Sequence, residues 1–496
     1  MVASGATGGA SAIPHPPRAK PAAASPTLRS WLAFDERPAF IELASTAIGR
    51  TLLFACFGGL LACMLPLRSA AVVLGGCAAA AFLRKRRDQA VLAATLASLA
   101  LDPSWYTDGP FEAYLAQLGS GGLLSVRSWQ RLLTAAFFVV AALLLRLVAR
   151  RPQSVLARRP VLCLLGALAL LSTLTLLLAE QPLWLVLSIK LLATYMWFLC
   201  YAVIDQRSAQ RSSPVFALGL VRPFWGPSST PIGKGASYLA KLRCDAPAAL
   251  ARVQLKGLKL LAWSFVLQGV SLTLTAATSR AGIVQLPELV RAFSEGQAVH
   301  AGLGWAAIIA AVASGTLELA IWGHRVVACA RLAGWNLRRN TWRPLASRSL
   351  ADFWNRYYFY FKELLVDFFF YPTFFRLFKR QPRLRTFCAT FMAAGIGNAI
   401  YHFVRDIDRV FSLGPVAALQ GYGSYAFYCL VLASGIALSQ LRTGTKAVPH
   451  GALPRVWAFA CVWGFVCCLQ VFGLEDRALS FGARLSFMLH QLGVES

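Results

Sequence analysis

Long apolar segments separated by short polar stretches dominate the hydrophobic pattern of this chain. Each apolar segment has roughly 16–25 residues, the length that a helix needs to cross the hydrocarbon core of a bilayer. We expect helices because an isolated segment must satisfy its own backbone hydrogen bonds in lipid. The pattern predicts about eleven membrane spans, at residues 45–66, 68–83, 89–104, 129–149, 160–179, 182–204, 256–279, 302–323, 386–403, 414–439 and 455–474.

The charge of the polar connections alternates along the first eight spans. Basic connections alternate with connections that are not basic, and the basic ones lie at residues 84–87, 146–159, 205–256 and 324–348. The positive-inside rule therefore predicts that these connections and the N-terminus are cytoplasmic. Residues 1–30 are rich in Ala, Pro, Gly and Ser, so we expect a disordered cytoplasmic tail there.

Composition and net charge restrict the class of protein. Of 496 residues, 57% are hydrophobic and 14% charged, whereas soluble domains are about 45–50% apolar and 25% charged. A soluble enzyme, a disordered protein and a secreted disulfide scaffold are excluded for the whole chain. The net charge of +28 lies in connections between apolar segments, so we expect membrane lipids and no nucleic acid as partners. The abundance of Ala and Arg favours a bacterial inner membrane and leaves a eukaryotic endoplasmic reticulum open.

The aromatic segment 347–385 interrupts the pattern of spans. It carries five ionisable residues, which are Asp352, Arg356, Lys362, Glu363 and Asp367, and both of its flanks are basic. Charged groups are costly at the centre of a bilayer. We therefore expect the segment either to enter the membrane and return to the cytoplasmic side, with a break near Pro372, or to lie along the inner interface as an amphipathic helix.

His402 is the strongest candidate for a chemical role. Of the six histidines, it alone lies within an apolar segment with a polar neighbour one helical turn away, Asn398. An ionisable residue in such a position is a candidate for a functional site, and histidine moves protons near neutral pH. The alternative is a structural histidine near the interface, bonded to Asn398 or to a backbone carbonyl.

Two motifs, in this order, resemble the membrane-bound O-acyltransferase (MBOAT) superfamily. The first comprises Asn340-Thr341-Trp342-Arg343-Pro344, then Ser347, Asp352, Phe353, Trp354 and Arg356; the second is Gly397-Asn398-Ala399-Ile400-Tyr401-His402. Phe224-Trp225-Gly226-Pro227 more weakly resembles an earlier Gly-Pro motif of the family. The firm match, from about Asn340 to Phe403, covers about an eighth of the chain.

The resemblance implies an acyltransferase with about 10–12 helices and His402 as general base. The donor would be acyl-CoA or another acyl thioester from the cytoplasm, with no permanently bound cofactor, and the acceptor a hydroxyl of a lipid, sugar or small molecule. Where the family has a second polar residue this chain has Tyr358, and Asn355 and Asn398 are the neighbouring candidates. The residues expected at the donor are Arg348, Trp354, Arg356 and Lys362. The three cations among them equally fit anchors at the membrane interface.

The sequence analysis thus predicts an all-α, polytopic membrane protein. We expect five regions: the tail 1–30, N-terminal helices 31–204, a basic cytoplasmic loop 205–256, an MBOAT-like core 257–410 and C-terminal helices 411–496. The spans and the broken aromatic segment also fit a transporter or lipid flippase, and Tyr358 also fits a non-catalytic relative of the family. The 12 cysteines are scattered without a C-x-x-C pair, so we expect no metal site.

Overall fold

The described part of the chain is built of helices and the loops that join them. The computed structural model describes residues 33–102, 106–107, 109–119, 124–178, 180–207, 212–226, 228–443, 451–476 and 478–494. These residues are 78% helical and form no strand, which confirms the predicted fold class. The tail predicted at residues 1–30 lies outside the described residues.

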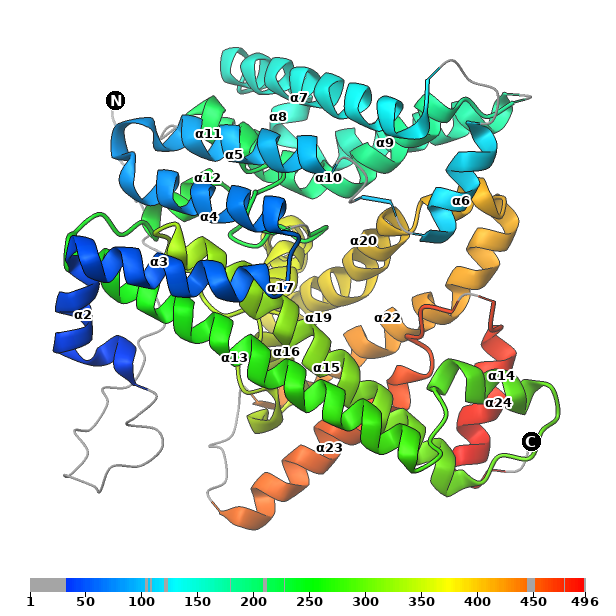
Figure 1. Ribbon diagram of the computed structural model, residues 1–496. Coiled ribbons are helices and arrows are strands. Elements are labelled where there is room, and N and C mark those ends of the chain that lie inside the picture. Colours follow the sequence, from blue (N-terminus) through cyan, green and yellow to red (C-terminus); the bar gives the residue numbers. More distant parts are fainter. Residues whose placement is uncertain are drawn as a thin grey trace.

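The helices of the N-terminal half are α2 (Pro38–Ser45), α3 (Ala47–Ala62), α4 (Leu67–Phe82), α5 (Arg87–Leu101), α6 (Gly109–Leu118), α7 (Val126–Arg150), α8 (Val155–Arg158), α9 (Pro160–Leu177), α10 (Leu183–Arg207), α11 (Pro214–Gly219) and α12 (Ala236–Lys241). Those that follow are α13 (Pro247–Arg280), α14 (Leu286–Ser294), α15 (Ala301–Leu332), α16 (Leu350–Tyr357), α17 (Phe359–Leu365), α18 (Tyr371–Phe374), α19 (Pro382–Phe391), α20 (Asn398–Arg405), α21 (Asp408–Ser412), α22 (Pro415–Thr443), α23 (Ala452–Gln470) and α24 (Phe481–Gln491). Figure 1 shows their arrangement.

Eight helices in the described part of the chain are long and apolar enough to cross a membrane, with the continuous helical segment Pro382–Arg405 counted as one. Two bent pairs raise the number to ten if each pair is one span: α2 with α3, bent by 96°, and α4 with the helical stretch Arg84–Leu101, bent by 109°. The three separate spans predicted at 45–66, 68–83 and 89–104 are therefore corrected. Helix α3 has 16 residues, and at 1.5 Å each it spans about 24 Å, less than the roughly 30 Å hydrocarbon core.

Helix α10 is the central helix of the fold. In its apolar window 78% of the residues are buried, against 17–50% in the other candidate spans. It packs against α7 and α9 on one side and against α20 on the other. Its aromatic residues Tyr195 and Trp197 are almost fully buried. This helix therefore belongs to the core against which α20 packs.

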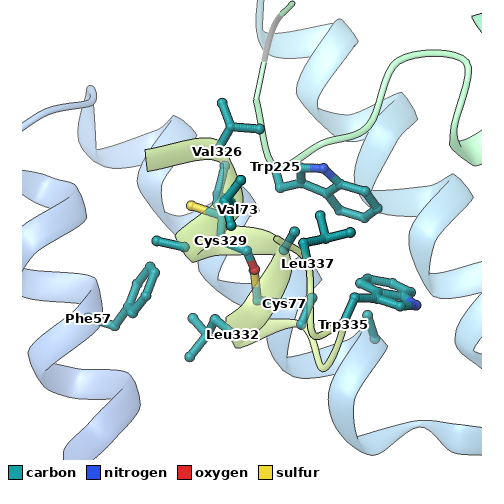
Figure 2. Packing of buried hydrophobic residues seen from close by; sticks show 14 of the residues in the cluster. Phe57, Val73, Cys77, Trp225, Val326, Cys329, Leu332, Trp335 and Leu337 are labelled. Atoms are coloured by element: carbon teal, nitrogen blue, oxygen red, sulfur yellow. The ribbon is translucent and has the colours of Figure 1, made fainter. Parts of the chain in front are cut away.

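A second core joins the first helices to the α13–α15 pair. Figure 2 shows Phe57 of α3 and Cys77 of α4 packed around Leu332 of α15 and the segment that follows it. Helices α13 and α15 run side by side over most of their length. At Gly257 a Cβ would stand 3.0 Å from the carbonyl oxygen of Ala328, so the absence of a side chain lets the two backbones approach closely.

Connections that the charge pattern assigns to the same side of the membrane contact one another. Arg87 forms a 2.9 Å ion pair with Asp245, and both residues lie in connections assigned to the cytoplasm. On the other side Tyr114 donates a 2.6 Å hydrogen bond to Gln181, and both belong to connections that are not basic. The packing of the loops thus agrees with the alternation of their charges, and the side that faces the cytoplasm stays a prediction.

Candidate functional site

The aromatic segment 347–385 forms short helical pieces instead of a span. Helices α16 and α17 are followed by a π-helical turn, η4 (Val366–Phe370), and by the four-residue helix α18, in which Pro372 lies in the first turn. Asp352 and Arg356 form the expected pair one helical turn apart, at 2.7 Å. The segment is broken as predicted, but the break lies at Tyr358, between α16 and α17, whereas the helical stretch from Phe359 continues through Pro372 and ends at Phe374. The depth of the segment in the membrane stays a prediction.

Lys234 holds the aromatic segment from a neighbouring loop. Its ammonium group lies 3.0 Å from Glu363 and 2.8 Å from Asp367, and Asp367 also accepts a 2.8 Å hydrogen bond from Tyr201 of α10. Burial alone would lower the pKa of Lys234, but the attraction of Asp367 and Glu363 outweighs it, so this pKa is raised. Burial opposes ionisation of Glu363 too, yet Lys362 and Lys234 hold its pKa below the ordinary value. Lys234 and Glu363 are therefore both charged at neutral pH.

His402 lies among aromatic rings contributed by two other helices. Its half-buried imidazole is 5.7 Å from the ring of Phe361 on α17 and 4.6 Å from the ring of Tyr425 on α22, between centroids. Phe361 also packs edge-on against Tyr401, at 4.7 Å. Phe361, which follows the first sequence motif by five residues, therefore contacts two residues of the second motif.

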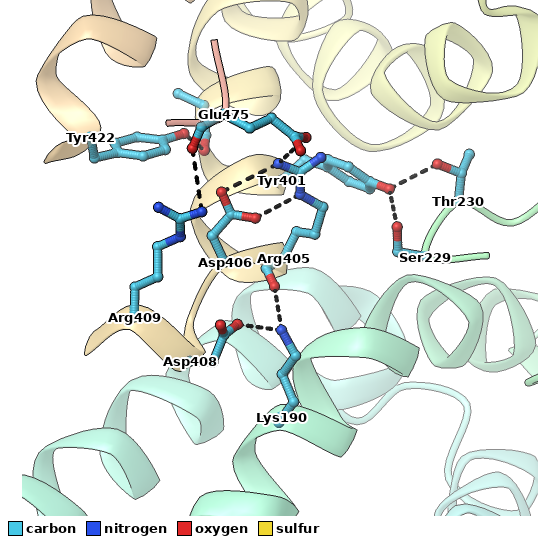
Figure 3. A network of polar contacts seen from close by, with 11 residues as sticks. Lys190, Ser229, Thr230, Tyr401, Arg405, Asp406, Asp408, Arg409, Tyr422 and Glu475 are labelled. Atoms are coloured by element: carbon cyan, nitrogen blue, oxygen red, sulfur yellow. Dashed lines mark hydrogen bonds and ion pairs between the residues drawn. The ribbon is translucent and has the colours of Figure 1, made fainter. Parts of the chain in front are cut away.

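A cluster of four hydroxyl groups contains Tyr358 and Tyr401, the residue that precedes His402. The Thr230 hydroxyl lies 2.8 Å from the Tyr358 hydroxyl and 2.8 Å from that of Tyr401. The Ser229 hydroxyl lies 2.9 Å from the same Tyr401 oxygen, as Figure 3 shows. Burial raises the pKa of Tyr358, so this phenol stays protonated and donates or accepts as a neutral group. The cluster fixes Tyr401, and with it the orientation of α20 at His402.

Charged residues fix the other end of α20 (Figure 3). Arg405, one turn beyond His402, pairs with Asp406 at 2.7 Å and with Glu475 at 3.2 Å. Lys190 of α10 forms an ion pair with Asp408 and donates a 2.9 Å hydrogen bond to the carbonyl of Arg405. Lys190, a cation within an apolar span, thus has its partner in the segment that follows α20.

A cavity of about 190 Å³ opens between α16, α17, α19 and α22. Three residues expected at the donor or the site line it: Trp354, Asn355 and Lys362. The other lining residues are Ala351, Phe361, Leu365, Val366, Phe370, Thr390, Ala393, Ala394, Ile436 and Gln440. His402 does not line this cavity, but Phe361 contacts both, so one aromatic ring stands between the cavity and the imidazole.

The other predicted site residues lie outside this cavity. Arg348 is exposed, and Arg356 is held by Asp352 and lies 5.0 Å from the centre of the Trp342 ring. Asn398 is 1% exposed, and its side-chain oxygen has no hydrogen-bond partner within the described residues. The roles proposed for these three residues stay predictions, and the environment of Arg356 equally fits a structural anchor.

Two π-helical turns pack together beside the cavity. One is η4, and the other is η5 (Met392–Gly397), which interrupts the helix that carries His402. A Cβ at Gly397 would stand 2.6 Å from the ring of Phe369, so only glycine fits here without movement. Such π turns are rare and are frequent at functional sites.

Sequence reasoning missed Ser229, Thr230, Phe361 and Tyr425. A signal for the first two exists, because only Ser228 separates them from the weak Phe224-Trp225-Gly226-Pro227 motif, of which Pro227 lies outside the described residues. No local pattern distinguishes Phe361 and Tyr425 from the many other aromatic residues. Only the packing of α17 and α22 against α20 reveals them.

Comparison with models of protein families finds no match, and no curated protein matches the chain. No group of three or more His, Cys, Asp and Glu residues in the described part of the chain could hold a metal ion. The helix lengths and their composition establish an all-α, integral, multi-pass membrane protein.

Proposed function

We propose that the protein is a membrane-bound acyltransferase that moves an acyl group from a thioester donor, acyl-CoA or an acyl carrier, to a hydroxyl acceptor. One observation carries the proposal: residues that directly follow the first MBOAT-like motif contact the second one. Phe361 packs on Tyr401 and His402, and Tyr358 is bonded through Thr230 to Tyr401.

The cavity supports entry of the donor from the cytoplasm. Phe361 and Lys362 of α17 line it, and Glu363 and Tyr360 of the same helix contact Lys234 and Arg338, which belong to connections assigned to the cytoplasm by their charge. Lys362 lines the cavity, and its ammonium group has three donors, of which one meets Glu363 at 2.5 Å. The apolar wall formed by Leu365, Val366 and Phe370 suits an acyl chain or a pantetheine arm.

In this mechanism His402 acts as general base. Its imidazole takes the proton of the acceptor hydroxyl while that oxygen attacks the carbonyl carbon of the thioester. The tetrahedral intermediate then collapses, the carbon–sulfur bond breaks, and the imidazolium returns the proton to the leaving thiolate. Tyr401 and the charged residues beyond Arg405 hold the helix that carries His402, which keeps the base within hydrogen-bond reach of the acceptor.

Lipid transport is a second candidate. The broken helices α16 to α18 and the π turn in the helix of His402 favour it, because transporters build their substrate sites from discontinuous helices. Transport requires no chemical change in the solute. Flux into proteoliposomes without an acylated product would support this candidate against the first.

The test is an acyl-transfer assay with purified protein in nanodiscs that contain host lipid extract. Labelled acyl-CoAs of several chain lengths are offered to the wild type, to His402→Ala and to His300→Asn, which changes an exposed histidine at the start of α15. We expect a labelled product from the wild type and His300→Asn and none from His402→Ala, and the mass of the product identifies the acceptor. Full activity of His402→Ala would refute the mechanism, and failure of the wild type to bind or consume any donor would refute the function.

A further inference from the structure

A strongly basic hairpin leads into the candidate span that carries His402, Pro382–Arg405. It consists of α18, the start of α19 and the turn between these two helices, which pack against each other. We call residues 371–385 the basic hairpin. No acidic residue lies between Asp367 and Asp406 in the sequence, so the neighbouring sequence does not neutralise the charge of the hairpin. Its five cations are Arg376, Lys379, Arg380, Arg383 and Arg385.

The protein provides no counter-ion for most of these cations. Arg385 lies over the ring of Phe374, 4.1 Å from its centre. The other four are exposed, and none of them makes an ion pair or a side-chain hydrogen bond with another described residue. Cations at the candidate site differ in this respect, because Lys234 and Lys362 are held by the carboxylate of Glu363. The hairpin therefore presents unpaired positive charge, which attracts an anionic partner.

Large apolar side chains are exposed between the cations. Phe375 is 65% exposed, and four others in the same hairpin are also exposed: Tyr371, Leu377, Phe378 and Leu384. Phe378 has a φ angle of 49°, in the left-handed region that glycine and asparagine usually occupy, so the geometry of the turn alone does not account for a phenyl ring there. Lys and Arg interleaved with Phe and Leu are typical of segments that lie at a membrane interface, with rings at the acyl chains and cations at the headgroups.

The hairpin is held at the end of a membrane span. Its last cations, Arg383 and Arg385, lie in the first turn of α19, where the candidate span Pro382–Arg405 begins. Lipid headgroups are therefore within reach, since the attraction of an anionic surface extends over a Debye length of about 10 Å at 0.1 M salt. Clusters of about 4–8 cations beside a span on its cytoplasmic side are typical of segments that bind anionic lipids. The positive-inside rule assigns the hairpin to that side.

We propose that the basic hairpin binds anionic phospholipids of the bilayer in which the protein lies. The lipid phosphates meet the four exposed cations, and the exposed rings of Phe375 and Phe378 insert at the boundary of the acyl chains. A zwitterionic headgroup has the same phosphate, but its own ammonium group cancels the net attraction. A soluble acidic protein would supply the charge, but the lipid is present at the hairpin at all times. The proposal does not depend on acyl transfer.

The experiment captures the neighbours of the hairpin with a photoreactive side chain. Phe375→p-benzoyl-phenylalanine places the probe at an exposed position and keeps an aromatic ring there. The protein is irradiated in nanodiscs that contain equal amounts of phosphatidylglycerol and phosphatidylcholine, and mass spectrometry identifies the lipid adducts. Because one cation near an anionic surface contributes roughly fivefold in affinity, we expect phosphatidylglycerol adducts in about tenfold excess or more. The ratio falls to about one, as in the bulk lipid, when four cations are removed together by Arg376→Gln, Lys379→Gln, Arg380→Gln and Arg383→Gln.

Two matched controls isolate the hairpin. The combined variant Arg84→Gln, Lys85→Gln and Arg86→Gln removes another exposed basic run and leaves the adduct ratio at Phe375 unchanged. The same probe in place of Phe459, which is exposed in the candidate span α23, reports the bulk lipid ratio. His402→Ala also keeps the ratio at Phe375, which separates a failure of this proposal from a failure of the proposed function.

A salt series keeps the test decisive if the variant with four changes does not fold. Raising the salt from about 0.05 to 0.5 M screens the hairpin and lowers the ratio for the unaltered cations. A ratio near one at Phe375, or a ratio that neither salt nor the removal of the cations lowers, overturns the proposal. Adducts with added acyl carrier protein in place of lipid assign the hairpin to a soluble acidic partner and overturn the proposal too.

Discussion

Replacing Thr230 by valine removes the central hydroxyl of the cluster and keeps the shape of the side chain. Thr230 is 1% exposed and bonds to both Tyr358 and Tyr401 at 2.8 Å. In Thr230→Val the Tyr401 hydroxyl keeps Ser229, whereas the buried Tyr358 hydroxyl loses this contact. A buried polar group left without a partner costs about 1–3 kcal/mol, and we expect a loss of this size in the free energy of unfolding.

The matched control is Ser229→Ala, which removes one of the two bonds of Tyr401 and leaves Tyr358 bonded to Thr230. We expect it to cost about 0.5–1.5 kcal/mol, as for an ordinary hydrogen bond. The double variant Thr230→Val with Tyr358→Phe removes both partners and should recover part of the loss. Steric trapping in bicelles measures the free energies of unfolding. A Thr230→Val protein as stable as the wild type would refute the account of the cluster.

Three further changes test the site helices. Gly397→Ala places a Cβ 2.6 Å from the Phe369 ring, so overpacking costs about 1–3 kcal/mol in unfolding measurements, whereas Gly423→Ala, with nothing within 4 Å of the added atom, shows no loss. Lys190→Met leaves Asp408, 8% exposed, without its cation, and the same measurement should show a loss of about 3–5 kcal/mol. An unchanged free energy of unfolding would contradict the assigned pair. The pKa of Glu363 is lower in the folded protein than in the unfolded chain. Its contribution to the free energy of unfolding is therefore present above about pH 4.3 and is lost as the pH falls through the folded pKa. Thermal unfolding between pH 7 and pH 3 should therefore lose this contribution in the wild type and not in Glu363→Gln, and identical pH profiles would contradict the assigned ion pairs.

The fold class follows from the sequence because the bilayer leaves few alternatives. Apolar length alone identifies the eight full-length spans, since each must be a helix. The first helices are exceptions, because sharp bends at Thr46 and at Leu83 divide them into short helices that are paired in two bent units. Arg87 illustrates the difference: it is read as a loop cation in the sequence, yet its side chain is 3% exposed and pairs with Asp245.

The candidate site is only partly readable from the sequence. His402 is recognisable because an ionisable residue is unusual inside an apolar run, and the pair of Asp352 and Arg356 follows from helical spacing. The partners of these residues come from distant segments, and no local pattern encodes that Thr230 meets Tyr401. The same holds for the Lys234 contacts to Asp367, which join a loop to a helix more than one hundred residues later.

The most direct test of the account is the turnover of an acyl-CoA thioester by the wild type and by His402→Ala, measured beside the affinity of each for a non-hydrolysable thioether analogue. Loss of a general base lowers turnover by about 10²–10⁴-fold, and because His402 does not line the donor cavity, the affinity for the analogue should not change. The account thus predicts turnover in the wild type, its loss in His402→Ala and equal binding by both. Equal turnover by the two proteins, or no turnover and no binding by the wild type, would contradict it.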